Sequence, residues 1–224
     1  MKDKSKRVLE IIQRLRKTYP KVHCALEYTN PLELLVATIL SAQCTDERVN
    51  KVTPALFQKC KTAAAYAQAK LEDIQTLIRS TGFYQNKTKN IQGAARMIAN
   101  VFEGQVPRTM EELVSLPGVG RKTANVVLGN AFNIPGMPVD THMIRVNNRL
   151  GLTHQQDPVK IEAELTSIVP KQDWTIYSHL IIWHGRARCR ARKPDCDQCE
   201  IKNLCPKIMT GTRKDKKKHR KSKV

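Results

Sequence analysis

Residues 116–132 read LPGVGRKTANVVLGNAF, and the first five of them form a turn between two short helical patterns. The second helical pattern begins at Arg121. Gly118 and Gly120 allow positive φ angles and leave backbone N–H groups uncovered, and the positive end of the following helix favours an anion. A phosphate group therefore fits at this turn. Because an isolated Gly-x-Gly would more simply be an ordinary turn between helices, the rest of the chain has to decide between the two interpretations.

The composition indicates an all-helical protein that binds a polyanion. Of the 224 residues, 41% are hydrophobic and 5% aromatic, so the chain is poor in the aromatic and β-branched runs that build sheets. The net charge is +19 and the pI is near 9.9, which is far beyond what solubility requires. Nucleic acid is the first candidate partner, and an anionic membrane surface is the second.

The sequence predicts a protein that does not enter a membrane. No stretch approaches the roughly 18 consecutive apolar residues of a membrane span, and the start, MKDKSKRVLEIIQRLRK, has no uninterrupted apolar signal region. We therefore expect a soluble, cytoplasmic protein. A transit peptide is the alternative for this basic amphipathic start, but Asp3 and Glu10 count against it and favour a plain first helix.

Apolar residues recur three and four positions apart along most of the chain, and no convincing strand pattern occurs. A first helix, ending before Pro20, is indicated by Val8, Ile11, Ile12 and Leu15. A second helix is specified by Asn30 as its cap, Pro31 in its first position and Glu33 three residues after the cap. Further helices are expected at roughly 46–58, 62–80, 87–103, 110–115, 120–131, 141–150, 158–169 and 173–184.

The C-terminal residues 212–224 read TRKDKKKHRKSKV and contain too little apolar surface to fold. From Arg213 onward they hold eight Lys or Arg and one Asp, a charge of +7, so that +19 less 7 leaves +12 on the rest of the chain. We expect a disordered basic tail on a folded body that is itself basic.

Cysteines cluster near the C-terminus. Four of the seven have the spacing C-x6-C-x2-C-x5-C: Cys189, Cys196, Cys199 and Cys205. In a reducing cytosol this cluster indicates a metal site rather than disulfides, and both zinc and an iron–sulfur cluster suit four thiolates. The single Cys-x-x-Cys argues against the paired knuckles of a zinc ribbon. The other three cysteines are expected to be small buried hydrophobic side chains: Cys24, Cys44 and Cys60.

Basic residues crowd the start of this cysteine cluster: Arg186, Arg188, Arg190, Arg192 and Lys193. Such density on a metal-stapled loop favours a phosphate-binding surface. The alternative is a solvated charged loop, and Asp195 is the only acidic residue nearby that would support it. We expect Arg190, Arg192 and Lys193 to contact DNA.

Two residues near the hairpin have the chemistry of a site. Lys122 lies two residues into the helix that follows the hairpin, so that a bound phosphate would bring the adjoining sugar close to its amine. A nucleophilic amine must be neutral, and the positive helix end and Arg121 both disfavour the cation. The alternative role for Lys122 is a simple phosphate contact. Asp140 precedes a helical pattern and, judged alone, would be its N-cap.

The segment at 116–132, followed by VDTH at 139–142, resembles the helix-hairpin-helix DNA glycosylases, and in particular their endonuclease III branch. The resemblance runs from about residue 6 through LSAQCTDERVNK to the cysteine cluster. It implies a two-domain all-α helix-hairpin-helix glycosylase fold with a C-terminal [4Fe-4S] loop. Residues 1–23 and 135–211 would form the first-helix and cluster domain, and residues 24–134 the central helical domain with the hairpin. The lesion lies in the cleft between the two domains in such enzymes.

The resemblance also implies roles for individual residues. Lys122 would be the nucleophile, which related mismatch adenine glycosylases lack, and Asp140 the catalytic carboxylate. Gln43 and Phe83 would fill the gap left by the flipped nucleotide, although leucine is common at the second position. The DNA phosphate would be held by Pro117, Gly118, Val119 and Gly120. The cluster would be held by the four clustered cysteines, and His142 receives no chemical role.

The function expected from this resemblance is base excision repair. The enzyme would be a bifunctional N-glycosylase and abasic-site lyase that removes oxidised pyrimidines from double-stranded DNA and cleaves 3′ to the abasic site by β-elimination. It would act as a monomer on the nucleoid of a prokaryotic cytoplasm. One rival is a monofunctional mismatch glycosylase, against which Lys122 and the lack of a second C-terminal recognition domain argue. The other rival is a non-catalytic protein that binds distorted duplex.

Overall fold

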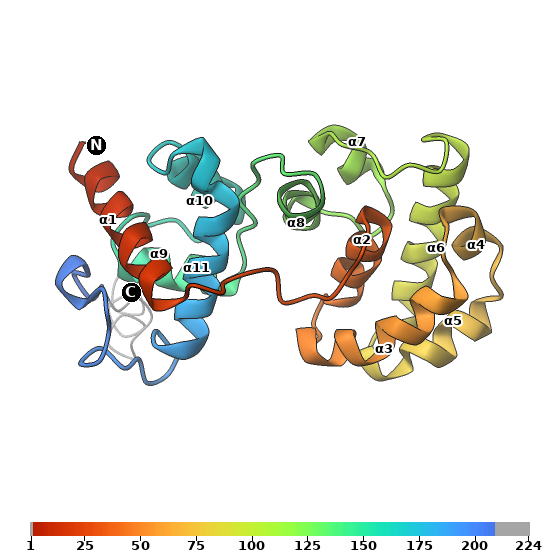
Figure 1. The fold of residues 1–224 in the computed structure, drawn as a ribbon, viewed down its shortest axis with the longest axis horizontal. Coiled ribbons are helices and arrows are strands. Elements are labelled where there is room, and N and C mark those ends of the chain that lie inside the picture. The colour runs from red at the N-terminus through yellow and green to blue at the C-terminus, as the bar shows by residue number, and fades with distance from the viewer. Residues whose placement is uncertain (1, 209–224) are drawn as a thin grey trace, which may run out of the picture. The chain divides into compact units, whose positions relative to one another are not determined.

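The computed structural model describes residues 2–208, and all regular structure in this range is helical, which confirms the predicted class (Figure 1). The chain divides into two compact units. The central unit comprises residues 24–138, and the discontinuous unit combines the chain up to His23 with the chain from Val139 onward. The predicted basic tail at 212–224 lies outside the described residues. None of the helices between residues 2 and 208 is both long enough and apolar enough to cross a bilayer.

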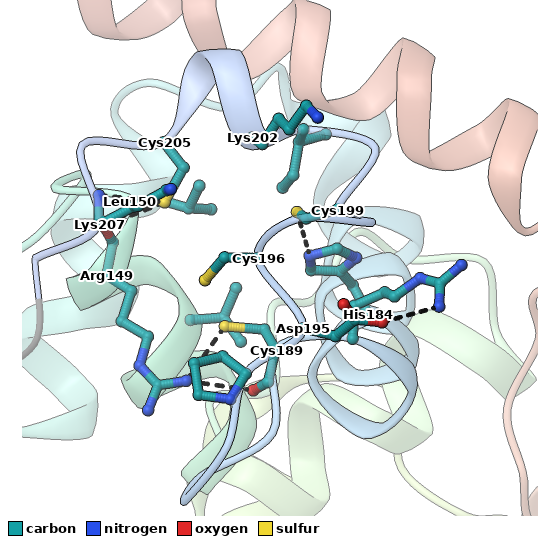
Figure 2. Close-up of a pocket in the computed structure, with 14 residues that line it drawn as sticks. Arg149, Leu150, His184, Cys189, Asp195, Cys196, Cys199, Lys202, Cys205 and Lys207 are labelled. Atoms are coloured by element: carbon teal, nitrogen blue, oxygen red, sulfur yellow. Dashed lines mark hydrogen bonds and ion pairs between the residues drawn. The ribbon is translucent and has the colours of Figure 1, made fainter.

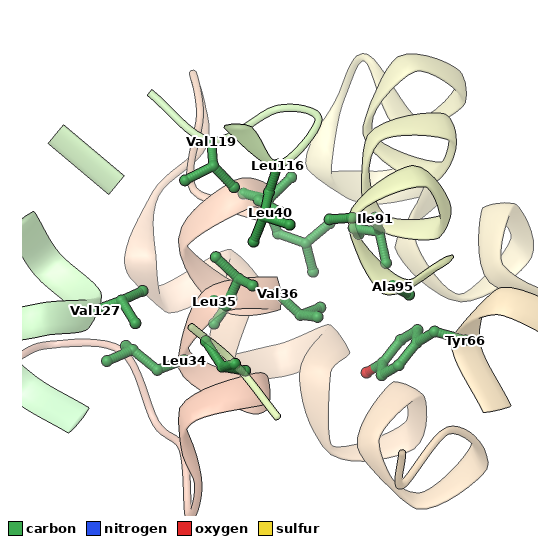
Figure 3. Close-up of a cluster of buried hydrophobic side chains, with 14 of the residues drawn as sticks. Leu34, Leu35, Val36, Leu40, Tyr66, Ile91, Ala95, Leu116, Val119 and Val127 are labelled. Carbon is green, nitrogen blue, oxygen red and sulfur yellow. The ribbon is translucent and has the colours of Figure 1, made fainter. Parts of the chain in front are cut away.

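The central unit is built around α2 (Pro31–Leu40), in which every residue from Leu34 to Leu40 is buried. Such a helix, apolar on all sides, belongs in the middle of a core. Figure 3 shows Leu34, Leu35, Val36 and Leu40 between Val127 of α8 on one side and Ile91 and Ala95 of α6 on the other. The remaining helices of the unit are α3 (Asp46–Lys59), α4 (Ala63–Gln68), α5 (Leu71–Ile78), the 3-10 helix η1 (Arg79–Thr81), α6 (Tyr84–Asn100), α7 (Met110–Ser115) and α8 (Arg121–Ala131).

The second predicted helix begins where its capping residues indicated. The Asn30 Oδ1 accepts the backbone N–H of Glu33 at 3.0 Å, and Pro31 occupies the first helical position.

The prediction of a single helix at 62–80 is wrong, because α4 and α5 are separated by two residues in extended conformation, Ala69 and Lys70.

A side chain from a different helix stabilises that break. The Gln92 amide of α6 donates to the carbonyl of Tyr66 at 3.2 Å and to that of Ala69 at 2.6 Å. These are carbonyls at the C-terminal end of α4, which have no partners within their own helix. Local periodicity carries no information about such a distant partner, which is why the sequence indicated one continuous helix.

The discontinuous unit packs α11 (Trp174–Ala187) against α1 (Lys2–Thr18) and α9 (Thr141–Arg149). The apolar face predicted for the first helix is buried in this contact: Val8, Ile11, Ile12 and Leu15. The Tyr177 hydroxyl of α11 donates to Asn147 Oδ1 of α9, and both side chains are fully buried. The other elements are α10 (Pro158–Thr166) and the short 3-10 helices η2 (Lys171–Asp173) and η3 (Lys202–Leu204).

The three cysteines outside the C-terminal cluster all belong to the central unit. Cys60 is 3% exposed in the hydrophobic core, as predicted. Cys24 and Cys44 are only partly buried and pack against that core, so the prediction that they are buried is wrong for these two.

Candidate functional site

The hairpin between α7 and α8 is fixed from beneath by two apolar anchors, Leu116 and Val119, which are 2% and 6% exposed. Gly118 has φ +76°, and a Cβ at this position would lie 2.6 Å from Cβ of Asn90. The hairpin therefore requires glycine there for both conformation and space. Gly120 differs, because its φ is −96° and a Cβ there would meet open space. Of the two glycines in the motif, one is required by the backbone.

The start of α8 offers backbone donors to an anion. Gly120 is the N-cap residue and has no side chain to accept the N–H groups of the first turn. The N–H groups at the positive end of this eleven-residue helix therefore receive no side-chain cap from that residue. Lys122 is exposed in that first turn, next to the exposed Arg121. A phosphate held at this helix end would thus lie beside the Lys122 amine, as the sequence predicted.

Asp140 lies at the start of the second segment of the discontinuous unit and is the N-cap of α9. Its Oδ1 accepts the backbone N–H of Met143 at 2.8 Å, so the capping role is confirmed. The cap uses one carboxylate oxygen and holds the group in one orientation. Lys122 belongs to the central unit and Asp140 to the discontinuous unit. His142 lies two residues after Asp140, and its Nδ1 is 3.0 Å from a guanidinium nitrogen of Arg145.

Gln43 and Phe83, the two predicted gap fillers, share an uncommon backbone conformation. Their φ angles are +53° and +48°, in the left-handed region that non-glycine residues seldom adopt. Both side chains are exposed, and Phe83 is 64% exposed. Phe83 is therefore not part of the hydrophobic core. Strained conformations of this kind are concentrated at functional sites.

The four clustered cysteines are brought together around one pocket of the discontinuous unit. Figure 2 shows them surrounding a common space below the start of η3: Cys189, Cys196, Cys199 and Cys205. Burial raises the pKa of the Cys199 and Cys205 thiols. The Cys199 Sγ also lies 3.5 Å from Nε2 of His184, which is 1% exposed. Within residues 2–208 no three or more His, Cys, Asp or Glu side chains are arranged closely enough to hold a single metal ion.

Arginines of the helices hold the cysteine loop by its carbonyl oxygens. Within residues 189–208 only Ile201 is buried, so apolar packing contributes little to the position of the loop. Arg149 of α9 donates to the carbonyls of Arg190 and Ala191, each at 2.8 Å, and approaches Cys189 Sγ at 3.3 Å. Sequence reasoning missed Arg149, because an arginine on a helix has no local feature that marks a partner some forty residues away.

The basic residues around the first cysteine divide into two groups. Arg190, Arg192 and Lys193 are exposed on the loop, where sequence analysis expected a DNA-contacting surface. Arg188 instead forms ion pairs with Asp195 at 3.2 Å and Glu200 at 3.1 Å. The sequence interpretation counted Asp195 as the only acidic partner and was wrong to omit Glu200. Arg188 is therefore committed to holding the loop together.

The comparison with protein families identifies the chain. A model described as "HhH-GPD superfamily base excision DNA repair protein" matches residues 36–171. The chain belongs to this superfamily. It is 56% identical to the endonuclease III of Synechocystis sp. over 92% of this chain and 94% of the relative. It is 42% identical to the endonuclease III of Escherichia coli strain K12 over 91% of this chain and 96% of the relative.

Solved structures agree with this membership. The fold is similar to that of endonuclease III in a non-covalent complex with DNA, with a TM-score of 0.85 and 43% identity over 96% of this chain and 98% of that one. A structure described as a trapped endonuclease III–DNA covalent intermediate matches with the same values. The resemblance found in the sequence is confirmed. The chain is a DNA glycosylase and abasic-site lyase of base excision repair, and it binds DNA.

Proposed function

We propose that this enzyme removes oxidised pyrimidines from double-stranded DNA and then cuts the strand 3′ to the abasic site through a Schiff base at Lys122. The observation that carries the proposal is the exposed Lys122 amine in the first turn of α8, directly after the hairpin that Gly118 shapes. The similarity to an endonuclease III that was trapped covalently on DNA supports it.

Each residue of the proposed site has one task. The hairpin N–H groups bind the phosphate. The Lys122 amine attacks C1′ of the sugar through its nitrogen lone pair, while the damaged base departs with the electrons of the glycosidic bond. Asp140, oriented by its bond to Met143 N–H, stabilises the positive charge that develops on the sugar and transfers the protons needed to form the imine. The imine acidifies the C2′ proton, and loss of that proton expels the 3′ phosphate.

Opening the duplex is the task of Gln43 and Phe83 in this proposal. A base inside the stack is out of reach of Lys122, so the nucleotide must leave the helix and side chains must fill the gap. Both residues are exposed on strained turns of the central unit, which also carries the hairpin. The exposed Arg190, Arg192 and Lys193 would contact the DNA backbone from the discontinuous unit.

The pocket lined by the cysteines fits a [4Fe-4S] cluster. Four thiols from one loop supply its ligand set, and cationic side chains line the same pocket and can offset the thiolate charge: Arg149, Arg188, Lys202 and Lys207. When bound, the cluster supplies covalent cross-links that fix the loop, and the reaction steps belong to Lys122 and Asp140. A single chain carries the hairpin, Lys122, Asp140 and the cysteine loop, which supports a monomer. The bacterial sources of the relatives support a prokaryotic enzyme that acts on nucleoid DNA in the cytoplasm.

Borohydride trapping on a thymine-glycol duplex tests the proposed chemistry. The unmodified enzyme should form a covalent adduct, because an imine is reducible, and Lys122→Gln should abolish the adduct while retaining DNA binding. Arg121→Gln removes a charge from the same helical turn and should retain the adduct. An undiminished adduct in Lys122→Gln would place the nucleophile elsewhere. Strand cleavage only after alkali would indicate a monofunctional glycosylase, and binding without turnover a non-catalytic protein.

Asp140→Asn separates catalysis from helix capping. Asparagine caps a helix as well as aspartate does, so the melting temperature should change little. The single-turnover rate should fall by about a hundredfold or more, because the carboxylate charge is lost. A rate equal to that of the unmodified enzyme would reduce Asp140 to its capping role.

A further inference from the structure

Lys87, in the first turn of α6, is a buried lysine that the reaction does not use. It is 4% exposed, and its Nζ donates to the carbonyl oxygen of Thr81 at 2.8 Å. Burial lowers the pKa of Lys87, and the nearby Cys44 thiol acts in the opposite direction. Placing an ammonium group in a protein interior is costly, so a buried lysine of this kind indicates a gain in stability or in precision of position.

The hydrogen-bond partner of Lys87 and the nearby thiol are each close in sequence to a proposed gap filler. Thr81 lies two residues before Phe83, and Cys44 directly follows Gln43. The two turns belong to neighbouring segments of the central unit, because η1, which ends at Thr81, packs against α3, which begins just after the Gln43 turn. Lys87 therefore binds the Phe83 turn directly and lies within electrostatic range of the residue that follows Gln43.

Lys87 also holds the Phe83 turn at two points. Its backbone N–H donates to the carbonyl of Phe83 at 3.0 Å, while its side chain binds the carbonyl of Thr81 on the other side of Gly82. Gly82 and Phe83 both have positive φ angles, +70° and +48°. Glycine adopts a positive φ without strain, but Phe83 carries a Cβ and persists in this region only when its surroundings hold it.

We propose that Lys87 is a positioning residue for base extrusion. Its ammonium group fixes the Phe83 turn through the Thr81 carbonyl, so that the Phe83 side chain is already presented when DNA binds. Without it, the strained turn would relax in the free enzyme and would have to be ordered again on the duplex. This inference rests on the proposed function, in which Gln43 and Phe83 fill the gap left by the flipped nucleotide.

Lys87→Met tests the inference, with Lys89→Met as its matched control. Methionine keeps the length of the side chain and removes the donor, and the control removes one charge from an exposed position of the same helix. On a duplex with 5-hydroxycytosine opposite guanine, Lys87→Met should lower the single-turnover excision rate by about tenfold to a hundredfold, as for a misplaced contact group. On a preformed abasic site, which is already unstacked, its cleavage rate should stay within about twofold.

Non-additivity with Phe83→Ala tells positioning from general destabilisation. If Lys87 acts through Phe83, adding Lys87→Met to Phe83→Ala should slow excision of the paired lesion no further than Phe83→Ala alone. Equal losses on both substrates, or fully additive losses in the double variant, would overturn the inference. Lys87→Met rates equal to those of Lys89→Met would overturn it as well.

The same data set separates this inference from the proposed role of Phe83. If Phe83→Ala slows both substrates equally, the wedge assignment fails first. If Phe83→Ala slows only the paired lesion and Lys87→Met does not, the Lys87 inference alone fails. Should Lys87→Met not fold, Lys87→Gln, which keeps a shorter donor, is measured in the same scheme with Lys89→Gln as control.

Discussion

The hairpin of the central unit and the cysteine loop of the discontinuous unit both present backbone and cations where DNA phosphate is expected, yet they are held in place differently. The hairpin rests on two buried side chains, Leu116 and Val119, and on the close approach of Gly118 to Asn90. The loop over 189–208 has one buried apolar side chain, Ile201. It is held by arginines that donate to its carbonyls and by four cysteines around one pocket.

The difference teaches which of the two regions needs a cofactor. Apolar burial contributes about 1.5 to 3 kcal/mol for each large side chain and acts without any partner beyond the chain itself. Hydrogen bonds on an exposed loop contribute about 0.5 to 1.5 kcal/mol each, because water competes for the same groups. A loop of this length with one apolar anchor therefore requires cross-links, and thiolate–iron bonds would supply them.

The largest effect on cofactor content and DNA binding should come from replacing one cysteine of the loop. Purified protein should be yellow-brown with about four irons per chain, and Cys199→Ser should lose most of this iron and much of its affinity for DNA. Cys60→Ala, in the core of the central unit, should keep the iron and lose only about 1 kcal/mol of stability. Iron analysis and the visible spectrum measure the first effect. Full iron content in Cys199→Ser, or zinc without iron after anaerobic purification, contradicts the cluster assignment.

A methyl group on the hairpin should have an intermediate effect. Gly118→Ala places a Cβ against Asn90 and imposes a positive φ on alanine, so we expect a loss of about 1 to 3 kcal/mol in stability of the free protein and weaker DNA binding. Gly120→Ala meets open space at an ordinary φ, and its thermal midpoint without DNA should fall far less. Thermal denaturation of the two variants decides. Equal midpoints would mean that packing beneath the hairpin is not what shapes it.

The smallest effects on stability should come from removing the hydroxyl group of one buried tyrosine in the core of each unit. Tyr177→Phe in the discontinuous unit leaves Asn147 Oδ1 without its donor, which should cost about 1 to 2 kcal/mol. In the described part of the central unit the buried hydroxyl of Tyr66 has no hydrogen-bond partner. Tyr66→Phe should therefore be neutral or slightly stabilising. Denaturant titration measures both, and a larger loss in Tyr66→Phe than in Tyr177→Phe would reverse the distinction.

Features encoded by neighbouring residues were predictable from the sequence. The caps at Asn30 and Asp140, the glycine with positive φ at Gly118 and the grouping of the clustered cysteines all follow from short spacings. Features that depend on distant partners were not. The break after α4 depends on Gln92, and Arg188 is neutralised by Glu200, neither of which local spacing reveals.

By itself, the sequence determined the all-helical class, the family and the chemical groups available for catalysis, because helical periodicity and short motifs are local properties of the chain. Only the tertiary structure decided that Phe83 is exposed on a strained turn, that Arg149 holds the cysteine loop and that Lys87 is buried with its amine on the carbonyl of Thr81. Burial and long-range hydrogen bonds depend on which segments pack together. Whether a lysine or an aromatic ring stabilises or destabilises the folded protein depends on that environment.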